Sequence, residues 1–412
     1  MNDSEKAKEP AKIAAEDRGE SIGLMEPLLI QDSSSRRAGL TDLALELAAA
    51  TAGLRRSLPD GVVRALADLV RAMNCYYSNL IEGHDTHPID IERALADDYS
   101  TDPTKRDLQL EARAHITVQA WIDDGGLDGR ALKDAGLREI HERFCKLLPD
   151  ALLWVENPTT GERVPVVPGE LRTHDVKVGR LIAVSPGAVP RFLDRFESAF
   201  AGLGRVDAIV AAATAHHRLL WLHPFVDGNG RVARLMSYAV LREALDTGGI
   251  WSVARGLARR EADYKKHLAE CDLPRRNDLD GRGSLSEEAL TAFARFFLEV
   301  CLDQVRFMEQ LMEPNRLRNR MVGWAEAESA SGALPAKAAL VLEAVLFRGE
   351  LARGDVEALL EASERTARRV TAALLERGVL TSTSSRAPLK LAFPAALASV
   401  WMPGLFPDQK HV

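Results

Sequence analysis

The feature that most constrains the fold is a long succession of apolar residues at helical spacing. Such segments cover residues 43–47, 62–80, 108–122, 132–148, 189–200, 206–222, 229–245, 260–272 and 286–311. This spacing gives a helix one apolar stripe to bury against a neighbour. One stretch, 152–184, is instead rich in Val, Pro, Thr and Gly, and its segments 164–167 and 176–178 are typical of short strands and a hairpin. The sequence therefore predicts a mainly α fold with one small β element.

Length and composition predict several units along the chain. With 412 residues, 46% of them apolar, the chain can bury more than one core. The first residues are charged and small, which is typical of disorder, and Ser329 to Pro335 is a polar and small-residue stretch that indicates a boundary. We predict a disordered tail (1–38), an N-terminal helical region (39–110), a helical core (111–312), a linker (313–335), a smaller domain (336–400) and a C-terminal tail (401–412).

The smaller domain has the order of a winged helix. Helical segments at 338–346, 352–360 and 364–375 precede two strand-like segments at 378–383 and 389–393. Arg365, Arg368 and Arg369 cluster on the third helix, where a DNA reader places phosphate contacts. Glu361 and Glu364 dilute that charge. DNA binding and a protein-contact or homodimer face both remain open for this domain.

Composition limits the partners and the compartment. The net charge of −7 gives no overall attraction to nucleic acid or anionic membrane, so such a site must be a local basic patch. The four cysteines lie far apart without metal-ligand spacing and are interpreted as reduced thiols. No apolar run approaches the roughly 20 residues that span a bilayer, and the start of the chain lacks the apolar region of a secretion signal. We predict a cytoplasmic protein with no membrane partner.

The chemistry is concentrated in the run from His223 to Arg234. Pro224 cannot extend a helix, so the preceding apolar helix should end near His223 and leave its imidazole at the mouth of a loop. Gly228 and Gly230 allow a tight turn, and Asn229 can cap the helix that follows. The first N–H groups of that helix then point outward with the positive end of its dipole. Such a turn is an anion cradle.

Three charged residues of the same run complete a phosphate site. Arg231 and Arg234 stand three positions apart at the start of the second helix, so both guanidinium groups can hold successive phosphates. Asp227 is a lone carboxylate beside them, suited to a Mg²⁺ ion that bridges phosphate oxygens. Each piece alone is a weak signal, because paired arginines on a helix usually form a solvated face. Together they predict a nucleotide polyphosphate site with a base.

This run resembles the signature of the Fic family. It fits the pattern His-Pro-Phe-x-Asp-Gly-Asn-Gly-Arg-x-x-Arg at all nine specified positions. The resemblance implies a Fic-type helical bundle, a β-hairpin flap and a protein adenylyltransferase that uses ATP and Mg²⁺. By that likeness His223 is the base on a Ser, Thr or Tyr hydroxyl of a target, Asp227 holds Mg²⁺, Gly228 to Gly230 cradle the phosphates, and Arg231 and Arg234 clamp them. The Doc branch, which phosphorylates, has a lysine and no glycine pair in this turn.

A second resemblance concerns regulation. Ser78, Glu82 and Gly83 fit the pattern Ser/Thr-x-x-x-Glu-Gly/Asn of the Fic inhibitory helix, in the class where that helix precedes the core. By that likeness Glu82 pairs with Arg234 and occupies the group that would hold the γ-phosphate. A charge-assisted pair contributes roughly 1.5–3 kcal/mol, which is enough to keep most molecules inactive. The resemblance implies an enzyme that is off by default.

The flap and one tyrosine are further matches. Val176, Lys177, Val178 and Gly179 resemble the Fic hairpin that covers the nucleotide and aligns a target protein by strand pairing. Tyr264 stands where relatives often have a tyrosine near the nucleoside.

Two other functions fit parts of the sequence. One is a winged-helix DNA-binding regulator whose Fic unit senses ATP; the complete set of His223, Asp227, Arg231 and Arg234 speaks against it, because sensing needs no base. The other is removal of AMP from a protein, with Glu82 positioning a water molecule.

Overall fold

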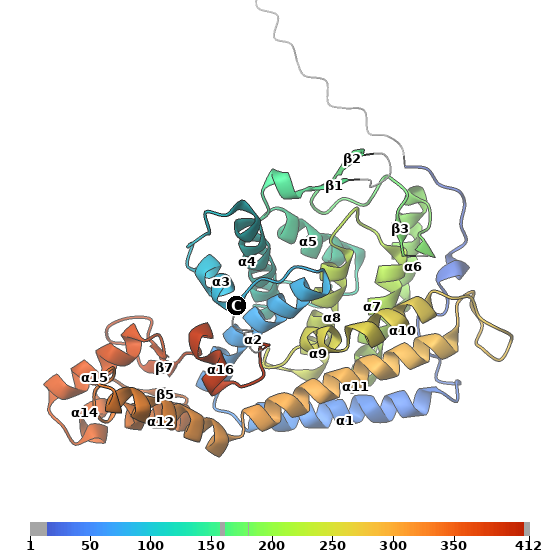
Figure 1. Cartoon of the computed structure of the whole chain (residues 1–412). Coiled ribbons are helices and arrows are strands. Elements are labelled where there is room, and N and C mark those ends of the chain that lie inside the picture. The colour runs from blue at the N-terminus through green and yellow to red at the C-terminus, as the bar shows by residue number, and fades with distance from the viewer. Residues whose placement is uncertain (1–14, 157–160, 180, 408–412) are drawn as a thin grey trace, which may run out of the picture.

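The computed structural model describes residues 15–156, 161–179 and 181–407 of the chain. These residues form a mainly helical molecule with three small antiparallel sheets, which confirms the predicted fold class (Figure 1). In the described part of the chain, no helix is both long and apolar enough to cross a membrane.

The core is a helical bundle in which α7 and α8 lie at the centre. Its helices are α1 (Arg37–Arg56), α2 (Asp60–Ile81), α3 (Pro88–Leu95), α4 (Pro103–Asp123), α5 (Asp134–Cys145), α6 (Val189–Ala199), α7 (Arg205–Leu222), α8 (Asn229–Leu245), α9 (Val253–Arg259), α10 (Glu261–Cys271) and α11 (Glu287–Leu311). Helix α7 is buried on nearly every side from Ile209 to Leu222, as its small and apolar residues allow. The long helices α1 and α11 pack side by side along one edge (Figure 1). The predicted boundary at 110/111 falls inside α4 and is wrong.

Two hairpins interrupt the helices where β structure was predicted. Strands β1 (Trp154–Glu156) and β2 (Arg163–Pro165) form one, and β3 (Lys177–Val178) and β4 (Leu181–Ile182) form the other. The β3–β4 hairpin pairs Lys177 with Ile182 and Val178 with Leu181, and Gly179 begins its turn with a φ of +58°. A positive φ of this kind is readily adopted by glycine alone among the common residues. The outer face of the β3–β4 hairpin is exposed, and Ile182 on it is 70% accessible.

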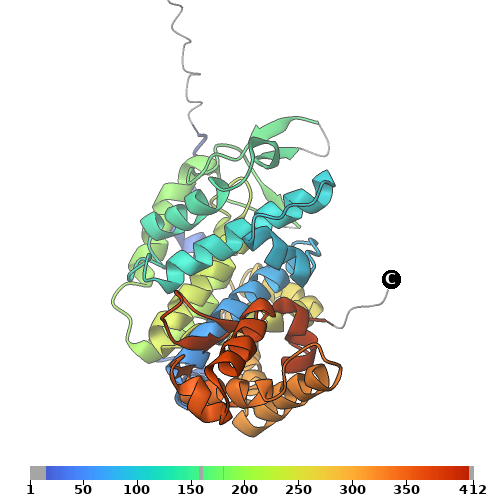
Figure 2. The same cartoon turned by 90° about the vertical axis from the view of Figure 1, so that its left-hand side faces the viewer.

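The C-terminal unit, residues 314–407, packs against α2 and α3 (Figure 2). It contains α12 (Pro314–Ala330), α13 (Ala338–Arg348), β5 (Glu350–Leu351), α14 (Asp355–Leu360), α15 (Glu364–Glu376), β6 (Leu380–Thr381), β7 (Leu389–Leu391) and α16 (Ala398–Trp401). The predicted linker at 313–335 is wrong, because Glu313 caps α12 and this helix packs on α13. The winged-helix assignment of 336–400 stays a prediction.

The predicted N-terminal tail is wrong for residues 15–38, and residues 1–14 lie outside the described part of the chain. Met25, Leu28 and Ile30 are buried in the core. Glu20 accepts hydrogen bonds from the backbone N–H of Ser185 at 2.8 Å and from its hydroxyl at 2.5 Å. A few well-spaced apolar side chains and buried hydrogen bonds are enough to order a segment that has no periodicity of its own.

The predicted C-terminal tail is also wrong for its described part, residues 401–407. Trp401, Met402 and Leu405 are each at most 1% exposed. The backbone oxygen of Leu405 accepts a hydrogen bond of 3.1 Å from Tyr77 on α2. The end of the chain is thereby joined to the helix that carries Glu82, and residues 408–412 lie outside the described part.

Candidate active site

His223 stands at the break between α7 and α8. Helix α7 ends at Leu222, and His223 takes a left-handed conformation with φ 50° and ψ 62° before Pro224. Its Nδ1 lies 3.3 Å from the backbone oxygen of Leu220. A carbonyl oxygen can only accept, so in the neutral ring Nδ1 carries the hydrogen and Nε2 has the free lone pair. Burial lowers the pKa of His223 to about 4, so the ring is neutral at physiological pH.

Arg172 holds this strained break in place. Its backbone N–H donates to the oxygen of Pro224 at 2.9 Å, and its Nε donates to the oxygen of His223 at 2.8 Å. The other guanidinium nitrogens donate to His174 at 3.0 Å and Val184 at 2.5 Å, on either side of the β3–β4 hairpin. Burial lowers its pKa to about 10, which leaves it protonated near neutrality. This role could not be read from the local sequence, because the contacts to His223 and Val184 join residues 51 and 12 positions apart.

The turn before α8 is fixed by an asparagine and supported by a histidine. Gly228 has a φ of +77° and is the cap of α8, so the predicted capping by Asn229 is wrong. The Asn229 amide instead accepts from the N–H of Phe225 at 3.0 Å and donates to its oxygen at 2.9 Å. The ring of His141, from α5, stacks on Phe225 at 4.1 Å and accepts a bond of 2.9 Å from the N–H of Gly169. His141 was not predicted, because nothing local in the sequence links it to this turn.

Arg231 turns toward α4. Its guanidinium donates to Glu111 at 3.2 Å and lies over the ring of Phe144, 5.2 Å from its centroid. Glu111 also contacts His84 at 2.7 Å, in the loop after α2. Arg231 is 6% exposed, so its charge is buried and paired. Glu111 is a site residue that sequence reasoning missed.

Arg234 is held by the end of α2 and its C-cap. Its Nε donates to the hydroxyl of Ser78 at 2.8 Å and its Nη2 to the backbone oxygen of Ser78 at 3.2 Å. Nη2 also pairs with the carboxylate of Glu82. Burial alone would raise the pKa of Glu82, but the charge and hydrogen bond of Arg234 bring it below the ordinary value. The contact predicted between Glu82 and Arg234 is present in the structure.

Glu82 reaches into the anion cradle itself. Helix α2 ends at Ile81, Glu82 is its C-cap, and Gly83 follows with a φ of +86° that only glycine takes without strain. The carboxylate lies so close to Gly230 that a Cβ added at position 230 would collide with Glu82 Oε1. The space above the first turn of α8 is therefore filled by an anionic group of the chain's own.

The remaining predicted residues divide into two groups. Asp227 is exposed at the mouth of the turn, and Val176 to Gly179 lie in the hairpin that Arg172 ties to it. Tyr264 is 2% exposed, and its hydroxyl lies 2.6 Å from Nε2 of His216, itself fully buried. The predicted nucleoside contact of Tyr264 stays a prediction; in the structure its hydroxyl is engaged within the core, where burial raises its pKa to about 12.

The region that carries this site is similar to a known family. Residues 131–241 match the family model described as the Fic/DOC family, and that range includes the whole run from His223 to Arg234. This part of the chain is thus similar to the Fic/DOC family, as its signature indicated. A crystal structure of a Fic family protein from Desulfovibrio desulfuricans G20 has the same fold, with a TM-score of 0.51 and 19% identity, over 88% of this chain and 98% of that one.

Curated relatives resemble the catalytic region. The protein adenylyltransferase fic-1 of Caenorhabditis elegans is 38% identical over 117 residues, 25% of this chain and 22% of that protein. The protein adenylyltransferase Fic of Drosophila melanogaster is 35% identical over 95 residues, 23% of this chain and 19% of that protein. The chain thus matches about a fifth of the length of these relatives.

Proposed function

We propose that this protein transfers AMP from ATP to a Ser, Thr or Tyr hydroxyl of a target protein. The observation that carries the proposal is a neutral histidine, its Nε2 free to accept a proton, next to a helix N-terminus and two buried arginines. The names of the curated relatives support the same activity. ATP sensing by a DNA-binding regulator, and removal of AMP, are not favoured by these comparisons.

The proposed reaction follows from the roles of the side chains. Nε2 of His223 takes the proton of the target hydroxyl as its oxygen bonds to the α-phosphorus of ATP. The bond between the α-phosphorus and the oxygen that bridges to the β-phosphate breaks, and pyrophosphate leaves. The N–H groups at Gly228 to Gly230, with Arg231 and Arg234, stabilise the charge on the phosphates.

Asp227 is the residue that fits a metal ion. It is exposed beside the cradle, and no cluster of three or more metal-ligating side chains occurs among the described residues. A single carboxylate suits Mg²⁺, which takes its other ligands from phosphate oxygens and water. Mg²⁺ bound there would neutralise charge on the phosphates during transfer.

The same geometry supports a restrained resting state. Arg234 cannot hold a phosphate while Ser78 and Glu82 hold it, and the carboxylate of Glu82 stands over Gly230, where an anion would sit. A phosphate bound over Gly230 would be repelled by the negative carboxylate of Glu82, so ATP must displace Glu82 to bind productively. The exposed face of the β3–β4 hairpin is the proposed docking edge for the target.

Labelled ATP tests this function. Glu82→Gly protein, with Mg²⁺, is expected to incorporate label from α-labelled ATP into itself or into lysate proteins, and Glu82→Gly/His223→Ala protein is the matched blank. The absence of α-label would refute adenylylation. Label arriving from the γ position instead would indicate phosphorylation.

A further inference from the structure

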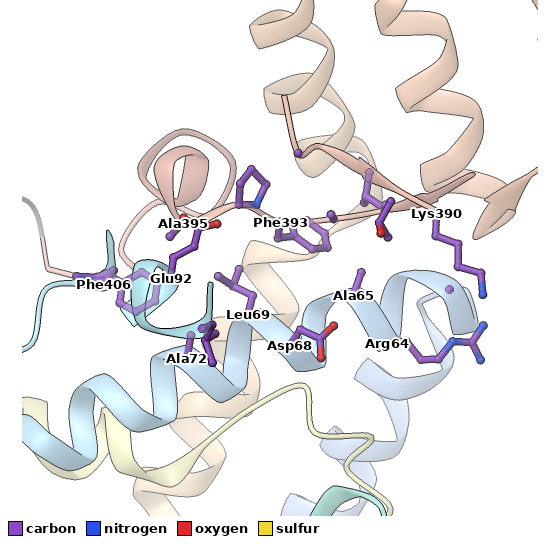
Figure 3. Close-up of a pocket in the computed structure, with 18 residues that line it drawn as sticks. Arg64, Ala65, Asp68, Leu69, Ala72, Glu92, Lys390, Phe393, Ala395 and Phe406 are labelled. Carbon is purple, nitrogen blue, oxygen red and sulfur yellow. The ribbon is translucent and has the colours of Figure 1, made fainter. Parts of the chain in front are cut away.

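A pocket of about 420 Å³ lies between α2, α3 and the C-terminal unit, away from the run that carries the chemistry (Figure 3). Helix α2 forms one wall with its first half, from Gly61 to Ala72. The segment from Lys390 to Ala395 and the ring of Phe406 form the opposite wall. Pockets of this size hold small organic ligands.

The pocket has an apolar body and charged ends. Leu69 and Phe393 line its middle, and Ala72 lies toward the end that holds Glu92. Arg64 and Lys390 lie together at one end, and Glu92 lies at the other, near Phe406 (Figure 3). Asp68 also lines the pocket, between Leu69 and Arg64, and its carboxylate is paired with Arg71 at 3.0 Å. Within the described residues Arg64 has no hydrogen-bonded or ion-paired side-chain partner, and Lys390 is 3.8 Å from Glu350.

The geometry sets the length of a fitting ligand. Arg64 and Ala72 are eight residues apart on one helix, which is about 12 Å at a rise of 1.5 Å per residue. An anionic group between Arg64 and Lys390 would gain two cations, and an apolar chain would cover the side chains of Leu69 and Phe393. A cationic head group would be repelled at that end and would gain one carboxylate, Glu92, at the other end, against the two cations that an anion gains.

We propose that this pocket binds a small amphipathic anion, a carboxylate on an unbranched apolar chain of about 12 Å, and that its binding weakens the hold of Glu82 on Arg234. The second part rests on the proposed function. No residue of the pocket belongs to the site from His223 to Arg234.

A continuous series of contacts joins the pocket to Glu82. The ring of Phe406 lies edge-on to Tyr76 of α2, with centroids 5.8 Å apart. The Tyr76 hydroxyl donates to Asp85 at 3.2 Å, and Asp85 is three residues beyond Glu82 in the loop after α2. Through this series of contacts, a ligand that binds more tightly to the conformation in which the Glu82–Arg234 pair is open loosens that pair.

Binding is tested first, without ATP. Calorimetric titration with octanoate is expected to give saturable binding to the full-length protein, weakened at least tenfold by Arg64→Glu and abolished by Ala65→Trp, which fills the pocket. Arg56→Glu, at the exposed end of α1, is the charge-reversal control and should bind as the wild type does. Thermal unfolding of each variant checks that it folds. Equal binding of octylamine, or no saturable binding of octanoate, overturns the site.

Coupling is tested separately by the labelling assay. Octanoate is expected to raise α-label incorporation by wild-type protein severalfold and to leave Glu82→Gly protein unchanged. Binding without this increase, when Glu82→Gly protein is active, overturns the coupling. If Glu82→Gly protein is itself inactive, the adenylylation proposal fails while the binding site, measured by calorimetry, still stands.

Discussion

Arg234 is held at three points, by the hydroxyl and backbone of Ser78 and by the carboxylate of Glu82. Each of those groups would lose its partner if Arg234 turned to a phosphate. At the scale of single residues, the proposed restraint is therefore a competition between Glu82 and a nucleotide phosphate for one guanidinium. Arg172 has a different role, because its hydrogen bonds hold the backbone at His223, His174 and Val184.

Arg172→Ala is predicted to destabilise the protein and to slow transfer. It leaves the oxygens of His223, His174 and Val184 without the donors they have in the structure. A buried acceptor without a partner costs about 1–3 kcal/mol in the free energy of unfolding. Urea unfolding measures that loss, and labelling by Glu82→Gly/Arg172→Ala protein measures the rate.

Arg172→Lys is the matched control for this change. Lysine keeps the charge but cannot reach acceptors in three directions, so an intermediate stability is expected. If Arg172→Ala unfolds at the same urea concentration as wild type and labels at the same rate, Arg172 does not position His223.

The local sequence predicted the turn within the run from His223 to Arg234 better than the distant residues that hold this run in place. The turn at Gly228 to Gly230 could be foreseen because Pro and Gly act on their own neighbours. His141 and Glu111 could not, since each reaches the run from another helix far back along the chain. The sequence did not predict that residues 15–38 are ordered, for a similar reason. Their contacts lie with residues more than 150 positions away.

At the scale of elements, α2 has two sets of neighbours. Its last turn holds Arg234 of α8, and its outer face carries the C-terminal unit through Tyr77 and Leu405. Helix α15 of that unit faces solvent, and Arg365, Arg368 and Arg369 are all exposed on it. Arg368 pairs with Glu364 at 2.5 Å, an exposed contact of little energetic weight.

Duplex DNA and a protein-contact or dimer partner stay the two open proposals for this face of α15, and binding of DNA through phosphates would depend steeply on salt. Three phosphate contacts give a log–log salt slope of roughly −2.7, at about −0.9 for each contact. Electrophoretic mobility shift at several salt concentrations measures that slope, and replacing the three arginines by alanine should abolish the shift. A mobility shift unaffected by the triple variant, or none at low salt, would leave a protein-contact or dimer face as the interpretation.

At the scale of the whole molecule, segments far apart in the chain pack against the β3–β4 hairpin and against α2. The segment 15–36 holds the base of the β3–β4 hairpin through Glu20 and Ser185, and the C-terminal unit covers α2. Its core also contains histidines that are kept neutral. Burial lowers the pKa to about 3 for His115 and His216, and to about 4 for His141 and His223.

These four histidines predict a loss of stability in mild acid. An unfolded histidine takes up a proton near pH 6.5, whereas the folded ones do so only near pH 3 to 4, so the unfolded chain binds more protons in between. The free energy of unfolding should therefore fall as the pH drops from about 6.5 to 4. Urea midpoints at pH 7, 6 and 5 measure this, and equal midpoints would contradict it.

Carboxylates do not explain a change in that range. Glu82 and Glu20 have lowered pKa values, so their contributions are lost only below their ordinary range near 4.5. If the free energy of unfolding decreases only below pH 4.5, the acid sensitivity belongs to the carboxylates and not to the histidines.

The most direct test of the account compares α-label incorporation by wild-type, Glu82→Gln and Glu82→Gly proteins at one ATP concentration. Glu82→Gln keeps the shape of the side chain and removes its charge. If the charge-assisted pair with Arg234 restrains transfer by roughly 1.5–3 kcal/mol, both variants should label about 10- to 100-fold faster than wild type. Wild-type protein that labels as fast as Glu82→Gly protein would contradict the account.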